Sequence, residues 1–378
     1  MVDDPDSIPL FKIDWNGSDI DTVTNSIKRG GYWAKGPYVD EFESKLEQYL
    51  DVEHAITVNS GTTALVAALR GMGIGEGDEV IVPSFTFIAT ANAVRLIGAD
   101  PIFADIDTQT YGLSPSDVES RITESTAGIL PVHCYGTSCQ IKQLSDIANE
   151  YDVHLIEDAA EVLGADYRGE KLGTFGDASA LSFCQNKITP TGEGGAIITD
   201  DDEIAREIEL YRSHGRATDD YFDSANSGQY VSLGTNIRMS DLTAALGCSQ
   251  MDRVTTLIEN RQQVAQQYNE HLNSIEGVHP HEPLSGANHV YQLYTIELSD
   301  WVDRKKVIEM LRQHNISSKV YWDPPVHQTE YYSKTTDQIP TLPNTERIAS
   351  RVLSLPMYPG LSNKEINRVV SGIRTAVD

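Results

Sequence analysis

Basic residues are scarce in this chain. Lysine and arginine together number 29 against 56 aspartates and glutamates, which gives a formal net charge of -27 at pH 7. A surface this negative repels the phosphates of nucleic acids and of anionic lipids, so we expect neither nucleic acid nor a membrane as a partner. The acidic residues are spread along the whole chain rather than gathered in a tail. Scattered acid suits a salt-rich cytoplasm, where screening weakens self-repulsion, and a halophilic source is therefore one hypothesis.

Long apolar runs are missing too. No run in the sequence approaches the roughly 20 residues that a membrane-spanning helix needs. The N-terminus, MVDDPDSIPLFK, has neither the basic start nor the apolar core of a signal peptide, so we expect a cytoplasmic protein. A chain of 378 residues is long enough for one large domain and one smaller domain, each with its own core.

Cysteines are few, and their spacing does not form a recognisable metal or disulfide pattern. The four are Cys134, Cys139, Cys184 and Cys248, and no two of them form a CxxC pair. A disulfide framework is not expected in a chain of this size. The segment HCYGTSC places His133 beside two of them, but this is not a standard zinc-ligand spacing and no second pair follows. We therefore predict buried structural thiols and no metal site.

What the chain does have is a regular alternation of short β-rich runs with helical stretches, from about residue 54 to residue 200. Most of these runs are continuously apolar, which is typical of strands buried on both faces of a sheet. The alternation predicts an α/β fold, in which a mainly parallel sheet carries helices on both faces. The expected strands lie at 54–59, 79–83, 100–106, 128–133, 154–158, 178–183 and 195–200.

The pattern changes after about residue 245. A long helical segment, residues 242–273, leads into a smaller α+β unit, and we place the domain boundary within this helix. The predicted domains are therefore 1–245, which holds an N-terminal segment and the large domain, and 246–378. The elements expected in the smaller domain are strands at 291–298 and 317–322 and helices near 303–314 and 363–376.

Two small features follow the first two expected strands, at the sheet edge where open α/β folds bind ligands. Ser60, Gly61 and Thr62 begin a helix with small side chains and free N–H groups, which suits a phosphate but is equally an ordinary helix cap. Phe87, in SFTFIAT, follows the next strand and is either an aromatic plate for a ligand or part of the core.

Two charged residues follow later strands at the same edge. Asp158 ends the apolar run HLIE and is either a ligand carboxylate or a helix cap. Lys187 lies between the run ASALSF and the glycine-rich turn TGEGG, where it is either a reactive amine or a surface lysine. A flat, phosphorylated, nitrogen-containing aldehyde such as pyridoxal phosphate (PLP) would use the phosphate site, the plate, the carboxylate and the amine together. Asp158 would then keep the ring nitrogen protonated, because an opposite charge favours the charged form.

Seven segments, in this order, resemble the sugar aminotransferases of the DegT/DnrJ/EryC1/StrS family, which are PLP enzymes of fold type I. The resemblance covers nearly the whole chain. It implies a large domain built on a mainly parallel, mixed seven-stranded sheet and a smaller C-terminal α+β domain. The segments are GGYWAKGPYVDEFESKLEQYL, NSGTTAL, GDEVIVPSFTFIATANAV, IEDAAEVLGADYRG, SFCQNKITPTGEGGAIITDD, LGTNIRMSDLTAALG and VLSLPMYPGLS.

The resemblance also assigns roles at the cofactor. Lys187 occupies the position of the Schiff-base lysine, whose freed amine would move a proton as general base and acid. Asp158 matches the ring aspartate, and Ser182 joins the Ser60–Thr62 turn as a phosphate ligand. Glu161 stands where the family usually has Gln or His, close to the cofactor's face or phenolic oxygen.

Further positions concern the neighbouring subunit and the substrate. Asn236 matches a residue that reaches the phosphate of the neighbouring subunit's cofactor, which implies a homodimer with two shared active sites; by itself it reads as a turn residue. His327 resembles a histidine of the family's substrate region, and Tyr321 is a further candidate there. Arg238 and Arg216 are candidate partners for an anionic substrate, or plain surface charges.

The resulting hypothesis is a PLP-dependent aminotransferase that passes the amino group of L-glutamate to a nucleotide-linked keto sugar, of the 4-keto-6-deoxy kind, for an amino sugar of a surface glycan. The lysine favours transamination, because family members that carry out deoxygenation have histidine at its position. A sugar dehydratase and a cyclitol-ketone aminotransferase remain alternatives. A catalytically silent PLP-binding sensor and an acidic scaffold without cofactor are alternatives from other classes.

Overall fold

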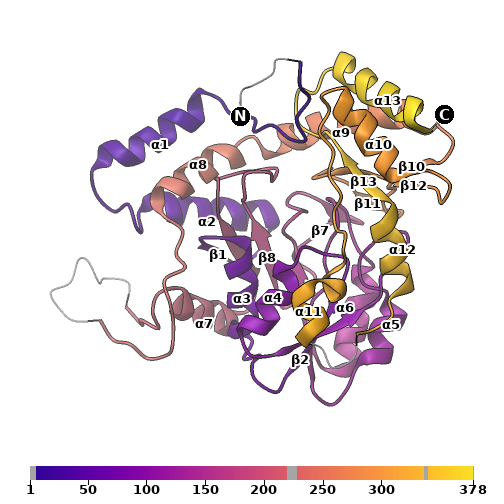
Figure 1. Ribbon diagram of the computed structural model, residues 1–378. Coiled ribbons are helices and arrows are strands. Elements are labelled where there is room, and N and C mark those ends of the chain that lie inside the picture. Colours follow the sequence, from indigo (N-terminus) through magenta and orange to yellow (C-terminus); the bar gives the residue numbers. More distant parts are fainter. Residues whose placement is uncertain (1–5, 219–227, 336–338, 378) are drawn as a thin grey trace.

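The computed structural model describes residues 6–218, 228–335 and 339–377, and its centre is a seven-stranded sheet (Figure 1). The strand order is β1-β9-β8-β5-β4-β2-β3. The five strands from β8 to β3 are parallel, while β9 runs antiparallel to both of its neighbours. The strands are β1 (His54–Val58), β2 (Glu79–Pro83), β3 (Asp100–Ala104), β4 (Thr126–Ile129), β5 (His154–Asp158), β8 (Ala178–Ser182) and β9 (Gly195–Thr199). All seven predicted strands and the mainly parallel, mixed sheet are confirmed.

Helices cover both faces of this sheet because successive side chains of each strand point to opposite faces. Ile81 packs into one core cluster, while its neighbours Val80 and Val82 pack into the other. The first cluster receives apolar side chains of α2 (Pro37–Leu50), α5 (Pro115–Arg121), α6 (Ile141–Tyr151) and α8 (Asp241–Met251). The second receives those of α3 (Gly61–Gly71), α4 (Ala89–Leu96) and α7 (Asp202–Arg212). This two-sided burial is the reason for the continuously apolar strands.

A separate hydrophobic core lies in the C-terminal part, where helices pack on a small antiparallel sheet of order β10-β12-β13 (Figure 1). Ile8 from the N-terminal segment joins this core and pairs with Ile316. The elements are β10 (Val278–Pro280), β12 (Tyr294–Leu298), β13 (Val352–Leu355), α9 (Val254–Leu272), α10 (Arg304–Gln313) and α13 (Asn363–Val377). The two predicted helices near 303–314 and 363–376 are confirmed. The domain division at residue 245 stays a prediction.

Two predictions for this part were wrong. Residues 242–273 are not one helix: α8 ends at Met251 and α9 begins at Val254. Between them lies Arg253, whose guanidinium binds Asp14, just before α1 (Gly17–Arg29), and Asp19, within α1. Residues 317–322 form no strand: Lys319 makes an isolated bridge with Ser354, and the N–H of Ser317 binds the carbonyl of Ile8.

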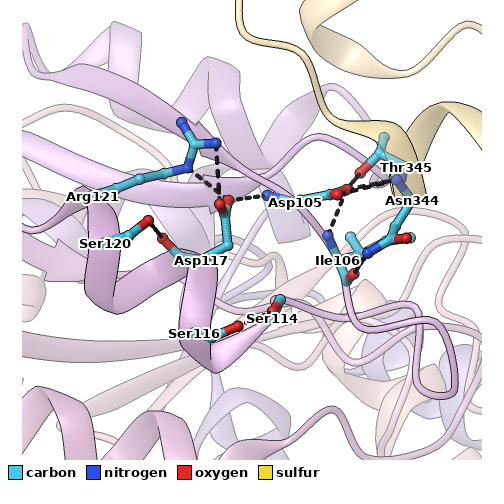
Figure 2. A network of polar contacts seen from close by, with 9 residues as sticks. All are labelled: Asp105, Ile106, Ser114, Ser116, Asp117, Ser120, Arg121, Asn344 and Thr345. Atoms are coloured by element: carbon cyan, nitrogen blue, oxygen red, sulfur yellow. Dashed lines mark hydrogen bonds and ion pairs between the residues drawn. The ribbon is translucent and has the colours of Figure 1, made fainter.

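The remaining elements are short, and one of them is fastened to the edge strand β3. Asp105, which follows β3, accepts hydrogen bonds from the backbone N–H groups of Asn344 (3.0 Å) and Thr345 (2.8 Å) at the start of α12 (Pro343–Arg351) (Figure 2). A carboxylate from the large sheet thus caps this C-terminal helix. The other short elements are β6 (Asp166–Tyr167), β7 (Glu170–Lys171), β11 (Ala287–Asn288), a 3-10 turn (Val326–Gln328) and α11 (Glu330–Thr335). Within the described ranges no helix is long and apolar enough to span a bilayer, and no cluster of three or more metal-binding side chains occurs.

Candidate active site

Lys187 lies in the turn between β8 and β9, and its amine is held by a carboxylate. Its Nζ atom lies 3.3 Å from Oε1 of Glu161, and the two side chains are only 13% and 11% exposed. The other oxygen of Glu161 accepts a hydrogen bond from the backbone N–H of Tyr135 at 2.8 Å. The backbone of Tyr135 therefore holds the carboxylate in place, and the carboxylate in turn holds the amine.

Asp158 ends β5 and presents a buried carboxylate to the same region. Its oxygens accept hydrogen bonds from the hydroxyl of Thr90 at 2.8 Å and the backbone N–H of Ala160 at 3.2 Å. Burial raises the pKa of Asp158, and the two hydrogen bonds and the charge of Lys187 act against that rise. A cationic ring nitrogen beside this carboxylate would favour its ionised form.

The start of α3 and the end of β8 approach closely enough to form a cradle. Ser60 caps α3 through a hydrogen bond from the N–H of Thr63 to its hydroxyl, at 3.2 Å. A Cβ on Gly61 would lie 2.8 Å from the Cβ of Ser182, so only glycine allows this approach. Because the first N–H groups of a helix have no partner within it, those of Gly61 and Thr62 can bind an anion. Thr62 itself is half-buried.

The structure separates the two phenylalanines that follow β2. Phe85 is fully buried in an aromatic cluster, whereas Phe87 is 61% exposed, so its ring is open to a ligand. The carbonyl of Phe87 accepts the N–H of Thr90, whose hydroxyl binds Asp158. The backbone at Phe87 is therefore linked, through Thr90, to the buried carboxylate.

Asn236 and Arg238 lie at the other edge of the sheet, on an extended segment beside β1, where the N–H of Asn59 binds the carbonyl of Ile237 at 2.7 Å. Asn236 is exposed. Arg238 donates to the hydroxyl of Ser213 at 2.9 Å. It borders a cavity of about 160 Å³ whose cationic lining is Lys35, Arg206, Arg212, Arg216 and Arg238, with Glu209 among the other residues. Burial lowers the pKa of Arg238, and the charges of Arg216 and Arg212 lower it further, while Arg212 itself is ion-paired with Glu43 and Glu209.

The two remaining substrate candidates differ in position. The carbonyl of Tyr321 accepts a hydrogen bond from the hydroxyl of Tyr135, whose N–H binds Glu161. Burial raises the pKa of Tyr321 to about 12, and the charge of Glu161 adds to the effect. His327 is buried next to the end of β2, with its Nδ1 2.6 Å from the hydroxyl of Ser84. Burial lowers the pKa of His327 and favours the neutral ring.

Sequence reasoning missed two residues that orient the site. Thr90 holds the carboxylate of Asp158, and the N–H of Tyr135 holds that of Glu161. Thr90 stands in the SFTFIAT segment and could have been found as a polar residue at a strand end. Tyr135 contributes only a backbone group, for which no side-chain signal exists.

The residues present fit a flat phosphorylated aldehyde with a ring nitrogen. They bring together an amine, a buried carboxylate and a helix start that only glycine can form. Of the predicted residues, Ser60, Gly61, Thr62, Phe87, Asp158, Glu161, Ser182, Lys187 and Tyr321 belong to this region. Within the described part of this chain, no contact joins Asn236 or Arg238 to Lys187.

Comparison with known proteins gives a consistent result. The model of the DegT/DnrJ/EryC1/StrS aminotransferase family matches residues 15–374. GDP-perosamine synthase from Caulobacter vibrioides is 37% identical over 362 residues, covering 95% of each chain. The crystal structure of DesV from S. venezuelae in complex with a ketimine intermediate has a TM-score of 0.91 and 31% identity, covering 98% of this chain and 99% of that chain. NtdA from Bacillus subtilis, with bound cofactor PMP, has a TM-score of 0.87 and 30% identity, covering 96% and 82%. The resemblance seen in the sequence and the fold that it implied are confirmed.

Proposed function

Since the chain belongs to the DegT/DnrJ/EryC1/StrS aminotransferase family, we propose that it transfers the amino group of L-glutamate to a nucleotide-linked keto sugar, with PLP as cofactor. The observation that carries the proposal is the convergence of the Lys187 amine, the Asp158 carboxylate and the helix start at Gly61. Bound PLP supplies a carbonyl carbon that takes up nitrogen and a ring that withdraws electrons.

Lys187 is the residue that would move the proton. Its Nζ would take a proton from the substrate carbon and return one on the cofactor side, as a general base and then acid. Glu161, 3.3 Å away, accepts a hydrogen bond from this amine and would keep it directed at the reacting carbon. Asp158, oriented by Thr90 and Ala160, would place a negative oxygen at the ring nitrogen.

The remaining residues would bind and orient the cofactor. The N–H groups of Gly61 and Thr62, with the hydroxyls of Ser60 and Ser182, suit the phosphate, because a helix N-terminus attracts negative charge. The exposed ring of Phe87 would cover one face of the cofactor and exclude water from it.

A nucleotide-linked substrate brings a diphosphate, which an acidic protein must attract locally. The cavity bordered by Arg212, Arg216 and Arg238 supplies such a place. The 37% identity to a GDP-perosamine synthase supports a 4-keto-6-deoxy sugar as the acceptor. Tyr321, linked to Glu161 through Tyr135, would contact the sugar, and His327 would act through its packing against Ser84.

We propose a homodimer with shared sites. Exposed apolar side chains occur on and near α1, at Trp15, Ile20 and Ile27, and on the segment before Asn236, where Leu233 is 77% exposed. Exposed apolar side chains are typical of association surfaces where they gather into one patch, and their gathering on and near α1 supports this proposal. In the dimer, the exposed Asn236 and the cationic cavity would face the partner's cofactor.

Subunit mixing tests the shared site. Lys187→Ala and Asn236→Ala subunits should each be inactive alone, yet a mixed dimer would keep one site in which both residues are intact. Mixing the two purified variants should therefore restore part of the activity. The reference is wild type mixed with an excess of one inactive variant, which gives the activity of a dimer with a single intact site. A mixture that exchanges subunits without recovering activity contradicts the sharing.

The transfer itself is tested with ¹⁵N-labelled L-glutamate and a GDP-linked 4-keto-6-deoxy sugar. We expect the label in an amino sugar detected by mass spectrometry. A product that has lost a hydroxyl group without gaining nitrogen would instead indicate a dehydratase.

We further propose that the reaction takes place in a salt-rich cytoplasm, a location that the four free cysteines support.

A further inference from the structure

Residues 290–293, which we call the 290–293 segment, touch both turns that hold the Lys187–Glu161 pair. The N–H groups of Val290 and Leu293 bind the carbonyls of Gly136 (2.9 Å) and Tyr135 (3.1 Å). The side-chain amide of Gln292 donates to the carbonyl of Asn186 at 2.7 Å. Asn186 directly precedes Lys187, and Tyr135 donates the N–H that fixes Glu161. One short segment is thus bonded to the supports of both members of the pair.

The close approach of this segment depends on glycine. Gly136 has a φ of +109°, and a Cβ there would lie 2.7 Å from the N atom of Gln292. A side chain at position 136 would therefore push the segment away from the Tyr135 turn. Gln292 itself is 2% exposed, so its amide has no access to water as an alternative partner.

The segment is anchored from behind by a buried arginine of α9. The guanidinium of Arg261 donates to the carbonyls of Tyr291 at 2.9 Å and Gln292 at 3.4 Å. Burial lowers the pKa of Arg261 to about 10, and its Nε has no hydrogen-bond partner among the described residues. The two hydrogen bonds from this charged group hold the carbonyls of Tyr291 and Gln292 from the side of α9.

We propose that Gln292 is a positioning residue for the transamination: it fixes the peptide before Lys187 to the same segment that fixes Tyr135, and so sets the amine against Glu161. This inference rests on the proposed function for its catalytic consequence. Its structural part concerns the protein alone. β12 begins at Tyr294, so the segment also ties the small C-terminal sheet to the catalytic turn.

The test compares Gln292→Met with a matched control, Gln262→Met. Gln262 is an α9 residue whose amide donates to Asn288 Oδ1 (2.8 Å) and the His289 carbonyl (3.0 Å), so the control loses the same kind of bonds beside the same segment but none to Asn186. Hydrogen exchange of the peptide covering 184–192 in the apoprotein should become roughly tenfold faster in Gln292→Met, because a lost buried hydrogen bond frees the turn locally, and should not change in the control.

The enzymatic arm uses steady-state kinetics with L-glutamate. Gln292→Met should lower kcat about tenfold with little change in KM, because the displaced amine affects the proton transfer and not substrate capture. Equal exchange in both variants, or an unchanged kcat in Gln292→Met, overturns the inference. Gln292→Asn, which keeps the amide but shortens its reach, decides by the same criteria if the methionine variant does not fold. A wild-type protein without transaminase activity would refute the proposed function, while the exchange result would still decide the structural part.

Discussion

Replacing Gly61 with alanine tests the cradle between α3 and β8. The added methyl would lie 2.8 Å from Cβ and 3.1 Å from Oγ of Ser182. Neither element can move away easily, because β8 pairs with β5 and β9 and the inner face of α3 is buried. Overpacking of this kind costs about 1–3 kcal/mol, and the higher helix propensity of alanine returns at most about 1 kcal/mol. We expect the free energy of unfolding to fall by about 1–2 kcal/mol.

The assay is urea unfolding of the apoprotein, followed by titration with PLP. Gly31→Ala is the control, because a Cβ there meets no atom within 4 Å, and we expect its unfolding free energy to stay within about 0.5 kcal/mol of wild type. Gly61→Ala should also bind PLP at least about tenfold more weakly, since a shift of about 1.4 kcal/mol in the cradle is a factor of ten in affinity.

A double variant locates the cause of the loss. Ser182→Gly removes the two side-chain atoms that the new methyl meets, so Gly61→Ala with Ser182→Gly should be more stable than the sum of the single effects by about 1 kcal/mol or more. If the two substitutions are simply additive, or if Gly61→Ala matches Gly31→Ala in both assays, the argument for a glycine-dependent cradle is wrong.

Three further predictions concern charge. Burial raises the pKa of Asp158, so the apoprotein loses stability as pH rises through that pKa. At neutral pH, apo Asp158→Asn should therefore unfold at a higher urea concentration than wild type. The variant should lose this advantage in acid and should be stabilised less by added PLP. Glu161→Gln keeps an acceptor for Tyr135 but removes the charge beside Lys187, so stopped-flow absorbance should show the half-reaction with L-glutamate slowed about tenfold, whereas an unchanged rate removes Glu161 from the proposed role. With a net charge of -27, the thermal midpoint should rise between about 0.1 M and about 2 M KCl, and a maximum in dilute buffer refutes the halophilic hypothesis.

Much of the fold could be predicted because its signals are local. Most strands of the large sheet are contiguous apolar runs, and the rule that ligands bind at the carboxyl ends of strands led to Asp158 and Lys187. The break between α8 and α9 had no such signal, because it depends on Arg253 reaching Asp14 and Asp19, more than two hundred residues earlier.

Residues 317–322 are a segment where a local signal predicted a strand that the tertiary structure does not form. They have the composition of a strand, but Tyr321 and Trp322 pack into the aromatic cluster around Phe85, and this tertiary contact overrides propensity. Glu161 and Asn236 were found only through the family resemblance. The contacts of Tyr135 and Gln292 with the turns that carry Glu161 and Lys187 use a backbone group or a distant side chain, which sequence patterns do not reveal.

The most direct test of the central claim is the visible absorption of the PLP-loaded protein in salt, before and after L-glutamate, with Lys187→Ala alongside. We predict that wild type has an absorption band from the cofactor bound to the Lys187 amine, that L-glutamate abolishes this band, and that Lys187→Ala never develops it. A variant whose spectrum is the same as that of wild type, or a wild-type band that L-glutamate leaves unchanged, would contradict the account.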